Sequence, residues 1–251
     1  MIRKNGIAKG KLITTMLSVL SLLLLWQLLS EILRLPALPG PLPSLRAFGA
    51  EMQNTLAFHL YVSAYRVMAS LAISLLLAVP LGMVLGREEK IDRYFAPLIY
   101  LIYPVPKIVF LPVLMALVGL KDLSKITLIV LVVFFQILVT TRDAARGISG
   151  ELVNSVLSLG ASRLDIYRHV VWPAVIPDVL TSLRIASGTA IAVLFFAETV
   201  ASQEGLGYYL LDAWSRMAYE NMFAGIIAMG LLGFVIYVGL DYLERRACPW
   251  K

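Results

Sequence analysis

The sequence predicts an all-α membrane protein with six transmembrane helices. Hydrophobic residues make up 59% of the 251 residues and charged residues only 15%, whereas a soluble globular chain carries roughly a quarter charged residues. Six stretches are apolar over about 20 residues, the length that a helix needs to cross a hydrocarbon core about 30 Å thick. They cover residues 12–33, 58–86, 94–119, 124–141, 178–200 and 222–243.

The composition excludes several other classes of protein. It is too apolar for a disordered chain or a coiled coil, and it lacks the repeats of a collagen and the cysteines of a secreted disulfide scaffold. Cys248 is the sole cysteine, so no internal disulfide can form. His59 and His169 each lack a second histidine at the helical spacing that a metal site uses, so we predict no metal site.

The first apolar stretch, residues 12–33, centres on the run from Leu22 to Trp26. It is longer than the core of a signal peptide, and no small-residue cleavage pattern follows it. We interpret it as a retained span, with a cleaved signal peptide as the alternative.

Basic residues are distributed unevenly between the two sides of a six-span arrangement. With the N-terminus inside, fourteen lysines and arginines lie on the cytoplasmic side and five on the outer side. Because basic residues accumulate in cytoplasmic loops, both termini are predicted to be cytoplasmic. The net charge of +6 matches loops that face anionic lipid, and it gives no reason to predict a nucleic-acid partner.

Two segments on the predicted outer side have patterns of their own. Residues 35–43 contain four prolines and are predicted to be extended. Residues 44–56 begin at Ser44, a suitable N-cap, and place apolar side chains at helical spacing, which predicts a short interfacial helix. Residues 206–218 show a similar pattern after the turn at Gly205 to Gly207 and predict a second such helix.

Four ionisable side chains fall inside the predicted spans: Arg66, Lys107, Arg184 and Glu198. Such groups usually face the interior of a helix bundle or a cavity, because exposing them to lipid is costly. Arg66 and Glu198 have similar predicted depths, so they could form a buried ion pair, line a path for an anionic solute, or extend to the interface. Arg184 lies near the cytoplasmic end and is expected to extend to the interface. Lys107 lies near mid-span beside two prolines and is the best candidate for a cation that lines a path.

Residues 142–177 form the longest predicted cytoplasmic segment, and they are too apolar for a plain loop. Apolar residues recur at helical spacing on both sides of Gly160 and predict two short amphipathic helices. These helices cover residues 151–159 and 161–171. Gly160 suits the turn between them because it can adopt a positive φ, and Pro173 and Pro177 are expected to end the second helix. Helices this short are not stable alone in water, so we expect a cytoplasmic partner to cover part of their apolar faces.

The order of residues in this loop resembles the signature loop of permeases of ATP-binding-cassette (ABC) importers. That signature reads Glu-Ala-Ala, three residues, Gly, nine residues, Ile-x-Leu-Pro. The spacing is intact here, although the Glu-Ala-Ala triplet is replaced and Trp172 stands for the leucine. The resemblance implies that an ATPase-coupling loop is formed by Asn154, Ser155, Val156, Gly160, Ala161, Ser162, Val170 and Pro173.

Further runs extend the resemblance over most of the chain, and they are similar to permeases of the nitrate, sulfonate and taurine type. They comprise residues 60–86 with Ser63, Arg66 and Gly82, Tyr103 to Lys107, Leu111-Pro112, Ser182 to Arg184, Ala197-Glu198 and Gly205 to Gly207. The resemblance implies the type I ABC importer permease fold, in which the chain forms the translocation path for a small solute, including anionic ones of the sulfonate, nitrate or taurine kind.

Partners and cofactors are implied by the same resemblance. It implies two copies of a separate ATPase subunit, a second copy of the permease and an extracytoplasmic solute-binding protein, in the lipid of a prokaryotic cell membrane. ATP and Mg²⁺ are expected on the ATPase and no cofactor on this chain, because its Gly6 to Leu12 run lacks the spacing and the hydroxyl residue of a phosphate-binding loop. The expected division is residues 1–57 as first span and outer linker, 58–244 as permease domain with the coupling loop 142–177, and 245–251 as cytoplasmic tail.

Two other functions are compatible with the spans alone. A stand-alone secondary transporter or channel often uses carboxylates near mid-membrane, and Glu198 is the one firm in-span candidate, near the outer end. An intramembrane enzyme needs converging acid, base or metal ligands, and no such set stands out in the sequence. The structured loop favours the importer permease, because neither alternative needs a pair of docking helices.

Overall fold

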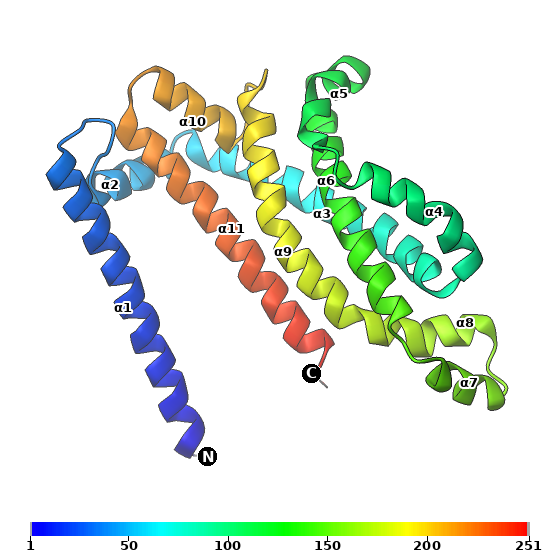
Figure 1. Ribbon diagram of the computed structural model, residues 1–251. Coiled ribbons are helices and arrows are strands. Elements are labelled where there is room, and N and C mark those ends of the chain that lie inside the picture. Colours follow the sequence, from blue (N-terminus) through cyan, green and yellow to red (C-terminus); the bar gives the residue numbers. More distant parts are fainter. Residues whose placement is uncertain (1, 250–251) are drawn as a thin grey trace. The chain divides into compact units, whose positions relative to one another are not determined.

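The computed structural model describes residues 2–249, with side chains described for residue 14 and from residue 16 onward. All regular secondary structure in this described part is helical. The long helices, coloured along the chain in Figure 1, are α1 (Ile2–Leu33), α3 (Leu56–Arg87), α6 (Asp122–Arg146), α9 (Trp172–Thr199) and α11 (Tyr219–Ala247). The shorter ones are α2 (Pro41–Met52), α4 (Glu89–Ile102), η1 (Lys107–Phe110), α5 (Leu111–Val118), α7 (Gly150–Ser158), α8 (Arg163–Ile166), η2 (Tyr167–Val171) and α10 (Leu206–Ser215).

The chain divides into two compact units, which are described separately. The smaller combines the residues up to Ala57 with Tyr209–Ala228, and the larger combines Phe58–Tyr208 with the residues from Met229 onward. The charged side chains predicted inside the spans and the whole 142–177 loop belong to the larger unit. The candidate functional residues therefore lie in one compact body.

In the smaller unit, the turn after α1 folds back onto that helix. The indole nitrogen of Trp26 donates a hydrogen bond to the carbonyl of Pro39 at 2.9 Å, and Ser30 donates to the carbonyl of Leu38 at 2.8 Å. The Trp26 ring also stacks on Phe223, with 5.4 Å between the ring centroids. These contacts close the turn without an extended segment.

Helix α2 begins earlier than the sequence pattern predicts. It starts at Pro41, because a proline in the first turn of a helix loses no intrahelical hydrogen bond. Ser44 lies inside the helix and donates to the carbonyl of Gly40 at 2.9 Å. The predictions of an extended segment over 35–43 and of an N-cap at Ser44 are therefore wrong. A short helix is nevertheless present in this region, as predicted.

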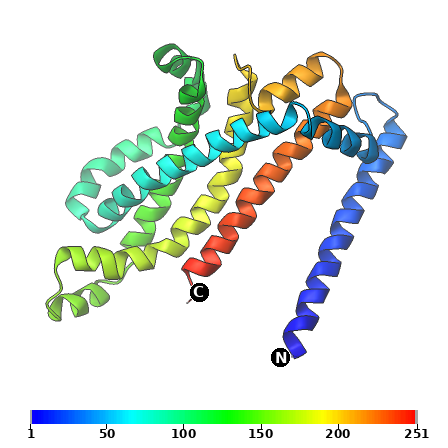
Figure 2. The same ribbon diagram turned by 180° about the vertical axis from the view of Figure 1, so that it is seen from behind.

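The centre of the larger unit is the contact between α6 and α9, which run side by side in Figures 1 and 2. Both helices bury one face. The α9 face is formed by Ala186, Ala190, Val193, Leu194 and Ala197, and the α6 face by Leu128, Ile129, Val133 and Ile137. Small side chains on α9 let the branched side chains of α6 approach closely, which is how helices associate in lipid.

Helix α3 meets α6 through glycines. A Cβ at Gly86 would clash with the carbonyl oxygen of Arg142 and lie 2.6 Å from the Cβ of Ala145, and a Cβ at Gly82 would also clash with α6. Only glycine allows two helix backbones to come this close. The contact fixes the end of α3 against the end of α6, at the start of the 142–177 loop.

Five helices in the described residues are long and apolar enough to cross a membrane, and a broken pair makes a sixth crossing if it is counted as one. The five overlap the predicted spans, although the helices extend further at their ends. The span predicted over 94–119 is broken, because α4 and the η1–α5 segment meet at a bend of 80°. Pro104 and Pro106 explain the break, since each lacks an amide hydrogen and restricts the residue before it.

The second helix of the 142–177 loop does not end at the prolines. Helices α8, η2 and α9 follow one another without interruption, and η2 is a π-helical turn. Pro173 lies in the first turn of α9, where its missing amide hydrogen costs little, and Pro177 is accommodated inside that helix. The prediction that these prolines stop the helix is therefore wrong, and the loop is directly continuous with the fifth span.

The glycine contact between α3 and α6 can be tested by stability. Gly86→Val is expected to destabilise the purified protein by about 1–3 kcal/mol, because the new side chain meets backbone atoms that cannot rotate away. The thermal midpoint in detergent measures this effect. Gly230→Val is the matched control, since a Cβ there meets nothing within 4 Å. Equal midpoints for the two variants would contradict the packing.

Candidate functional site

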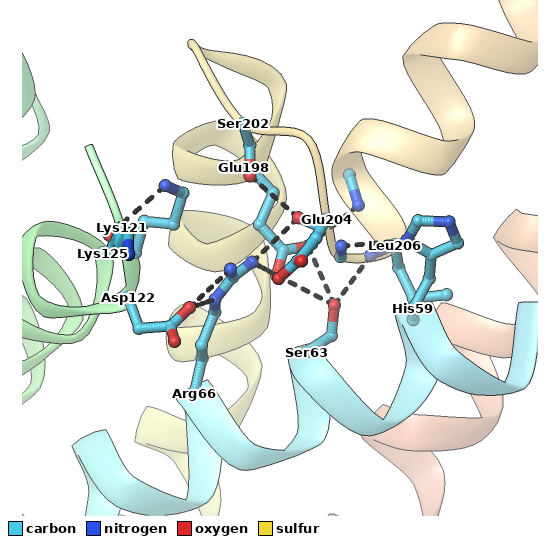
Figure 3. A network of polar contacts seen from close by, with 12 residues as sticks. His59, Ser63, Arg66, Lys121, Asp122, Lys125, Glu198, Ser202, Glu204 and Leu206 are labelled. Carbon is cyan, nitrogen blue, oxygen red and sulfur yellow. Dashed lines mark hydrogen bonds and ion pairs between the residues drawn. The ribbon is translucent and has the colours of Figure 1, made fainter.

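A buried network of polar side chains joins α3, α6 and α9 (Figure 3). At its centre, Arg66 of α3 and Glu198 of α9 form an ion pair, with 2.7 Å between Arg66 Nη1 and Glu198 Oε1. The two side chains are 2% and 0% exposed. Of the three roles considered for these residues, the geometry is that of a buried ion pair.

The Glu198 carboxylate accepts hydrogen bonds from several directions. The hydroxyl of Ser63 lies 2.9 Å from both carboxylate oxygens and donates to them, and the backbone amide of Gly207 donates to Oε2 at 2.9 Å. A buried charge is costly unless such hydrogen bonds accompany the ion pair. Ser63 and Gly207 therefore satisfy hydrogen-bond acceptor sites of the Glu198 carboxylate that Arg66 alone would leave unpaired.

The turn after α9 is shaped around this carboxylate. Gly205 has a φ of +106°, and a Cβ there would clash with the carboxyl group of Glu198. A Cβ at Gly207 would lie 2.6 Å from the carbonyl oxygen of Phe195. Only glycine fits at these two positions, which gives a physical reason for the Gly-Leu-Gly run in the sequence.

Arg66 uses its remaining donors on neighbouring groups. Its Nε and Nη2 lie 2.7 Å and 2.6 Å from Oδ1 of Asp122, at the start of α6, and its Nη1 donates to the backbone carbonyl of Glu204 at 2.9 Å. All three nitrogens of the guanidinium group are thus engaged. This suits a role in holding α3, α6 and α9 together better than contact with a passing solute.

Two further side chains of α3 hold the turn between α9 and α10. The amide of Leu206 donates to the hydroxyl of Ser63 at 2.8 Å, and the amide of Gly205 donates to Nδ1 of His59 at 3.1 Å. Sequence patterns place His59 near this end of α3 but assign it no partner. The backbone of the turn is therefore positioned by side chains that lie about 140 residues earlier in the chain.

Lys107 lies at the break between α4 and α5 and not within a continuous span. Its Nζ donates to the carbonyls of Ile102, Tyr103 and Val105 at 3.2, 2.7 and 3.3 Å. Carbonyls at the C-terminal end of a helix carry partial negative charge, so a cation there stabilises the helix end. This capping role is additional to the path-lining role predicted for Lys107.

The same lysine lines a cavity of about 420 Å³. The wall of the cavity is formed by Tyr103, Val105, Pro106, Lys107 and Ile108 of the break, by Val132, Phe135 and Gln136 of α6, and by Val193 of α9. Lys107 Nζ lies 4.9 Å from the centroid of the Phe135 ring, a cation–π contact. A cation at a break in a membrane helix, beside a cavity, is typical of a solute path.

Arg184 of α9 pairs with two carboxylates, which the sequence patterns did not predict. Its Nη1 lies 3.0 Å from Asp241 and 3.2 Å from Glu244, both on α11. The two carboxylates are three residues apart and lie on the same face of that helix. These carboxylates compensate the charge of Arg184, which is only 23% exposed.

The 142–177 loop exposes its turn. Gly160 has a φ of +84°, as its predicted turn requires, and a Cβ there would meet nothing within 4 Å. Leu159 and Leu164, on either side of the turn, are 87% and 75% exposed. Adjacent apolar side chains that are this exposed are typical of a surface that binds a partner.

A capping box begins the second loop helix. The hydroxyl of Ser162 accepts from the amide of Asp165, and the carboxylate of Asp165 accepts from the amide of Ser162 at 2.9 Å. The hydrogen bonds from the Ser162 side chain and backbone lower the pKa of the exposed Asp165 carboxyl, which lies outside the spans. The turn is therefore fixed locally, even though its apolar side chains are uncovered.

The residues of the signature differ in exposure. Asn154, Ser155, Gly160 and Ser162 are exposed, Val156, Ala161 and Pro173 are half-buried, and Val170 is buried. Two of the exposed members, Gly160 and Ser162, lie at the turn and the other two on α7, whereas the buried Val170 lies next to the start of α9. The turn is therefore the end of the loop that is available to a partner.

Sequence patterns miss one ion pair near the loop. They place Arg142 in the loop without a partner, but it makes two hydrogen bonds with Asp92 of α4, and Nη2 lies 2.7 Å from Oδ2. The two side chains are 4% and 10% exposed. The available signal is weak, because it consists only of an arginine at the end of one apolar helix and an aspartate in the first turn of another.

Residues 78–247 match the family described as "Binding-protein-dependent transport system inner membrane component", and the chain belongs to this family. It is a multi-pass inner-membrane permease component of the binding-protein-dependent ABC importers, in which ATP hydrolysis takes place in a separate ATPase subunit. Membership of this family excludes the alternative of a stand-alone secondary transporter or channel.

Relatives with high coverage are permeases. "Taurine transport system permease protein TauC" of Escherichia coli (strain K12) is 32% identical over 199 residues, which cover 79% of this chain and 72% of the relative. "Putative aliphatic sulfonates transport permease protein SsuC" of Bacillus subtilis (strain 168) is 26% identical over 252 aligned residues, which cover 99% of this chain and 90% of the relative. The resemblance to permeases of the sulfonate and taurine type is confirmed.

Two solved structures confirm the predicted fold. The MetNI methionine ABC transporter in an inward-facing conformation matches with a TM-score of 0.65 at 18% identity, over 78% of this chain and 97% of that one. A bacterial ABC transporter involved in the import of the acidic polysaccharide alginate matches with a TM-score of 0.62 at 15% identity, over 98% and 99%. At these identities the likeness shows the type I importer permease fold alone.

The ion pair predicts how charge changes will behave. Glu198→Lys is expected to reduce the yield of folded protein strongly, because a second cation beside the buried Arg66 costs about 3–5 kcal/mol. Adding Arg66→Glu should restore part of the yield, and adding Asp122→Asn should restore more, because Asp122 would otherwise face the introduced carboxylate. Size-exclusion chromatography of membrane extracts measures the folded fraction.

Glu204→Gln is the control for these charge changes, since Glu204 contacts Arg66 through its backbone carbonyl. This variant should give the yield of the unmodified protein. A double variant no better than Glu198→Lys alone would show that the pairing does not matter for assembly.

Proposed function

We propose that the chain forms the translocation path of an importer for a small anionic solute of the sulfonate, taurine or nitrate kind. Relatives that are similar over most of the chain are named for taurine and for aliphatic sulfonates, which supports this class of solute. The observation that carries the proposal is Lys107 at the cavity. Its three carbonyl partners are neutral, so they orient the ammonium group without cancelling its charge.

The proposed importer contains two permease copies, two ATPase subunits and an extracytoplasmic solute-binding protein. ATP and Mg²⁺ belong to the ATPase, and this chain holds no cofactor. The exposed turn at Gly160 is the proposed docking element for the ATPase, with the signature residues of the loop around it. The exposed Leu159 and Leu164 support this assignment, because a partner that covers them removes apolar surface from water.

In the membrane, we propose that both termini and the 142–177 loop are cytoplasmic. The unequal number of basic residues on the two sides supports this orientation. Residues 58–244 then form the permease domain, preceded by the first span with its outer linker and followed by a short cytoplasmic tail. The broken α4–α5 pair counts as one crossing in this arrangement.

The coupling role of the loop predicts a selective loss. Gly160→Val should insert and fold but lose most solute uptake and most solute-stimulated ATP hydrolysis, because a branched residue at a positive φ strains the turn by about 1–2 kcal/mol. Proteoliposomes that contain the permease, its ATPase and the binding protein, supplied with taurine or a short alkyl sulfonate, give both readouts. Gly160→Asn should keep more activity, because asparagine tolerates this backbone conformation.

Gly147→Ala is the control in the same loop, since Gly147 has an ordinary φ of −69°. A cysteine in place of Ser158 should cross-link to the ATPase. Normal uptake by Gly160→Val, together with no cross-link, would show that this loop is not the coupling element.

The orientation predicts the behaviour of reporter fusions. A phosphatase fused after Lys251 should be inactive and one inserted near Gly40 should be active, because phosphatase folds only outside the cytoplasm. Fluorescent-protein fusions at the same positions should give the opposite pattern. An active phosphatase at the C-terminus would contradict the proposed orientation.

A further inference from the structure

Helix α4 connects the 142–177 loop region with the cavity at Lys107. Its first turn lies beside the end of α6, where the loop begins, and the carbonyl of its last residue, Ile102, accepts a hydrogen bond from Lys107. Over its fourteen residues, a rise of about 1.5 Å per residue separates the two ends by about 20 Å. The helix is therefore long enough to carry a displacement from the loop to the cavity.

Few contacts hold α4 to the rest of the unit. Within this helix, which the structure describes in full, only Asp92 and Ile99 are buried, while Tyr94 and Leu101 are each 72% exposed. Asp92 binds Arg142 of α6 through both carboxylate oxygens, and the guanidinium carbon of Arg142 also lies 5.9 Å from the centroid of the Tyr100 ring. Because apolar packing is sparse, this ion pair is the main specific contact that positions α4.

The corner between α3 and α4 contacts the loop both before α7 and at its second helix. Arg87 donates to the carbonyl of Ile148 at 3.2 Å, just after α6. The carboxylate of Glu88 lies 3.5 Å from the hydroxyl of Tyr167 and 3.9 Å from a guanidinium nitrogen of Arg163, at the start of the second loop helix. A displacement of the loop would therefore move Arg87 and Glu88, which lie directly before α4.

At the other end, the chain is built to bend. The 80° change of direction between α4 and the η1–α5 segment occurs over residues that include Pro104 and Pro106. Lys107 is the side chain that ties this end of α4 to the segment beyond the break. A rotation of α4 about its base would move Tyr103 and Val105, which form part of the cavity wall.

We propose that the Asp92–Arg142 ion pair is the positioning contact through which the loop moves α4 and so changes the cavity beside Lys107. The inference rests on the proposed function, because it takes the loop to be driven by an ATPase. It adds a positioning pair that neither contacts the ATPase-docking turn nor lines the cavity. Asp92 and Arg142 act through α4 and not on the solute itself.

A purely structural ion pair makes a different prediction. Replacing both partners of a buried ion pair by apolar residues is often neutral or stabilising, because no uncompensated charge remains. The double variant Asp92→Leu with Arg142→Met should therefore keep the fold while removing the charged link. If the pair only stabilises the protein, this variant will transport normally, whereas a positioning pair cannot be replaced in this way.

The experiment uses the full importer in proteoliposomes, with the permease, its ATPase and the binding protein, and taurine as the probe. The first readout is the number of taurine molecules imported per ATP hydrolysed. The second is the labelling of a cysteine in place of Val105 by a membrane-impermeant thiol reagent, with and without ATP. Cys248→Ser in all variants leaves the introduced cysteine as the only thiol of the permease chain.

Glu89→Gln is the matched control, since Glu89 pairs with Arg93 on the same helix at 3.1 Å but both side chains are about 80% exposed. A surface pair of this kind contributes little. The charge-swapped variant, Asp92→Arg with Arg142→Asp, tests whether the link itself restores coupling.

We expect the apolar double variant to co-purify with the ATPase but to import at least about fivefold less taurine per ATP, the lower end of a typical coupling energy. Labelling at position 105 should then no longer respond to ATP, whereas Glu89→Gln should behave as the unmodified protein in both readouts. Partial recovery in the charge-swapped variant would support the inference further.

Unchanged import per ATP and ATP-dependent labelling in the apolar double variant would overturn the inference and leave the proposed function intact. Failure of the unmodified chain to bind an ATPase or to import taurine would instead overturn the proposed function, and the inference with it.

Discussion

The structure of the larger unit depends on one fully buried carboxylate. Glu198 is 0% exposed, so it needs a cation and several hydrogen-bond donors within the protein. Those donors come from α3 and from the turn after α9, and Arg66 brings in α6 through Asp122. In lipid, apolar packing alone gives helices little reason to prefer one neighbour over another. The network supplies that preference, and it requires glycine at Gly205 and Gly207.

The break at Lys107 solves a similar problem in a different way. Backbone groups that leave a helix inside a membrane must be satisfied by protein or water. Lys107 satisfies one carbonyl at the end of α4 and two in the break that follows, and it does so beside a cavity, whereas the guanidinium group of Arg66 is surrounded by protein. The two cations therefore differ in their surroundings: Arg66 is enclosed by polar groups of three helices, and Lys107 lies at the wall of a cavity.

The loop shows which parts of a family signature are needed for folding. The Glu-Ala-Ala triplet is replaced, yet α7 forms, because Asn154 and Ser155 are exposed and no packing depends on them. Gly160 is retained, because the turn requires its positive φ, and the capping box at Ser162 fixes the start of the second loop helix. Solved permeases with 15–18% identity share the fold. The replacement of the triplet therefore leaves the helix–turn–helix geometry of the loop intact.

The sequence by itself determined the order of the apolar spans, the positive φ at Gly160 and the family, because apolar length, glycine and motif spacing act within a few residues. The tertiary structure alone decided the angle of the break after α4, the continuity of α8 with α9, the acidic partners of Arg184 and the pairing of Asp92 with Arg142. Arg66 and Glu198 lie between these cases, because their charges predict a pair but not its other contacts. The acidic partners Asp92 of Arg142 and Glu198 of Arg66 lie 50 and 132 positions away in the chain. Which of them meet is set by how the helices pack, and no local pattern records that.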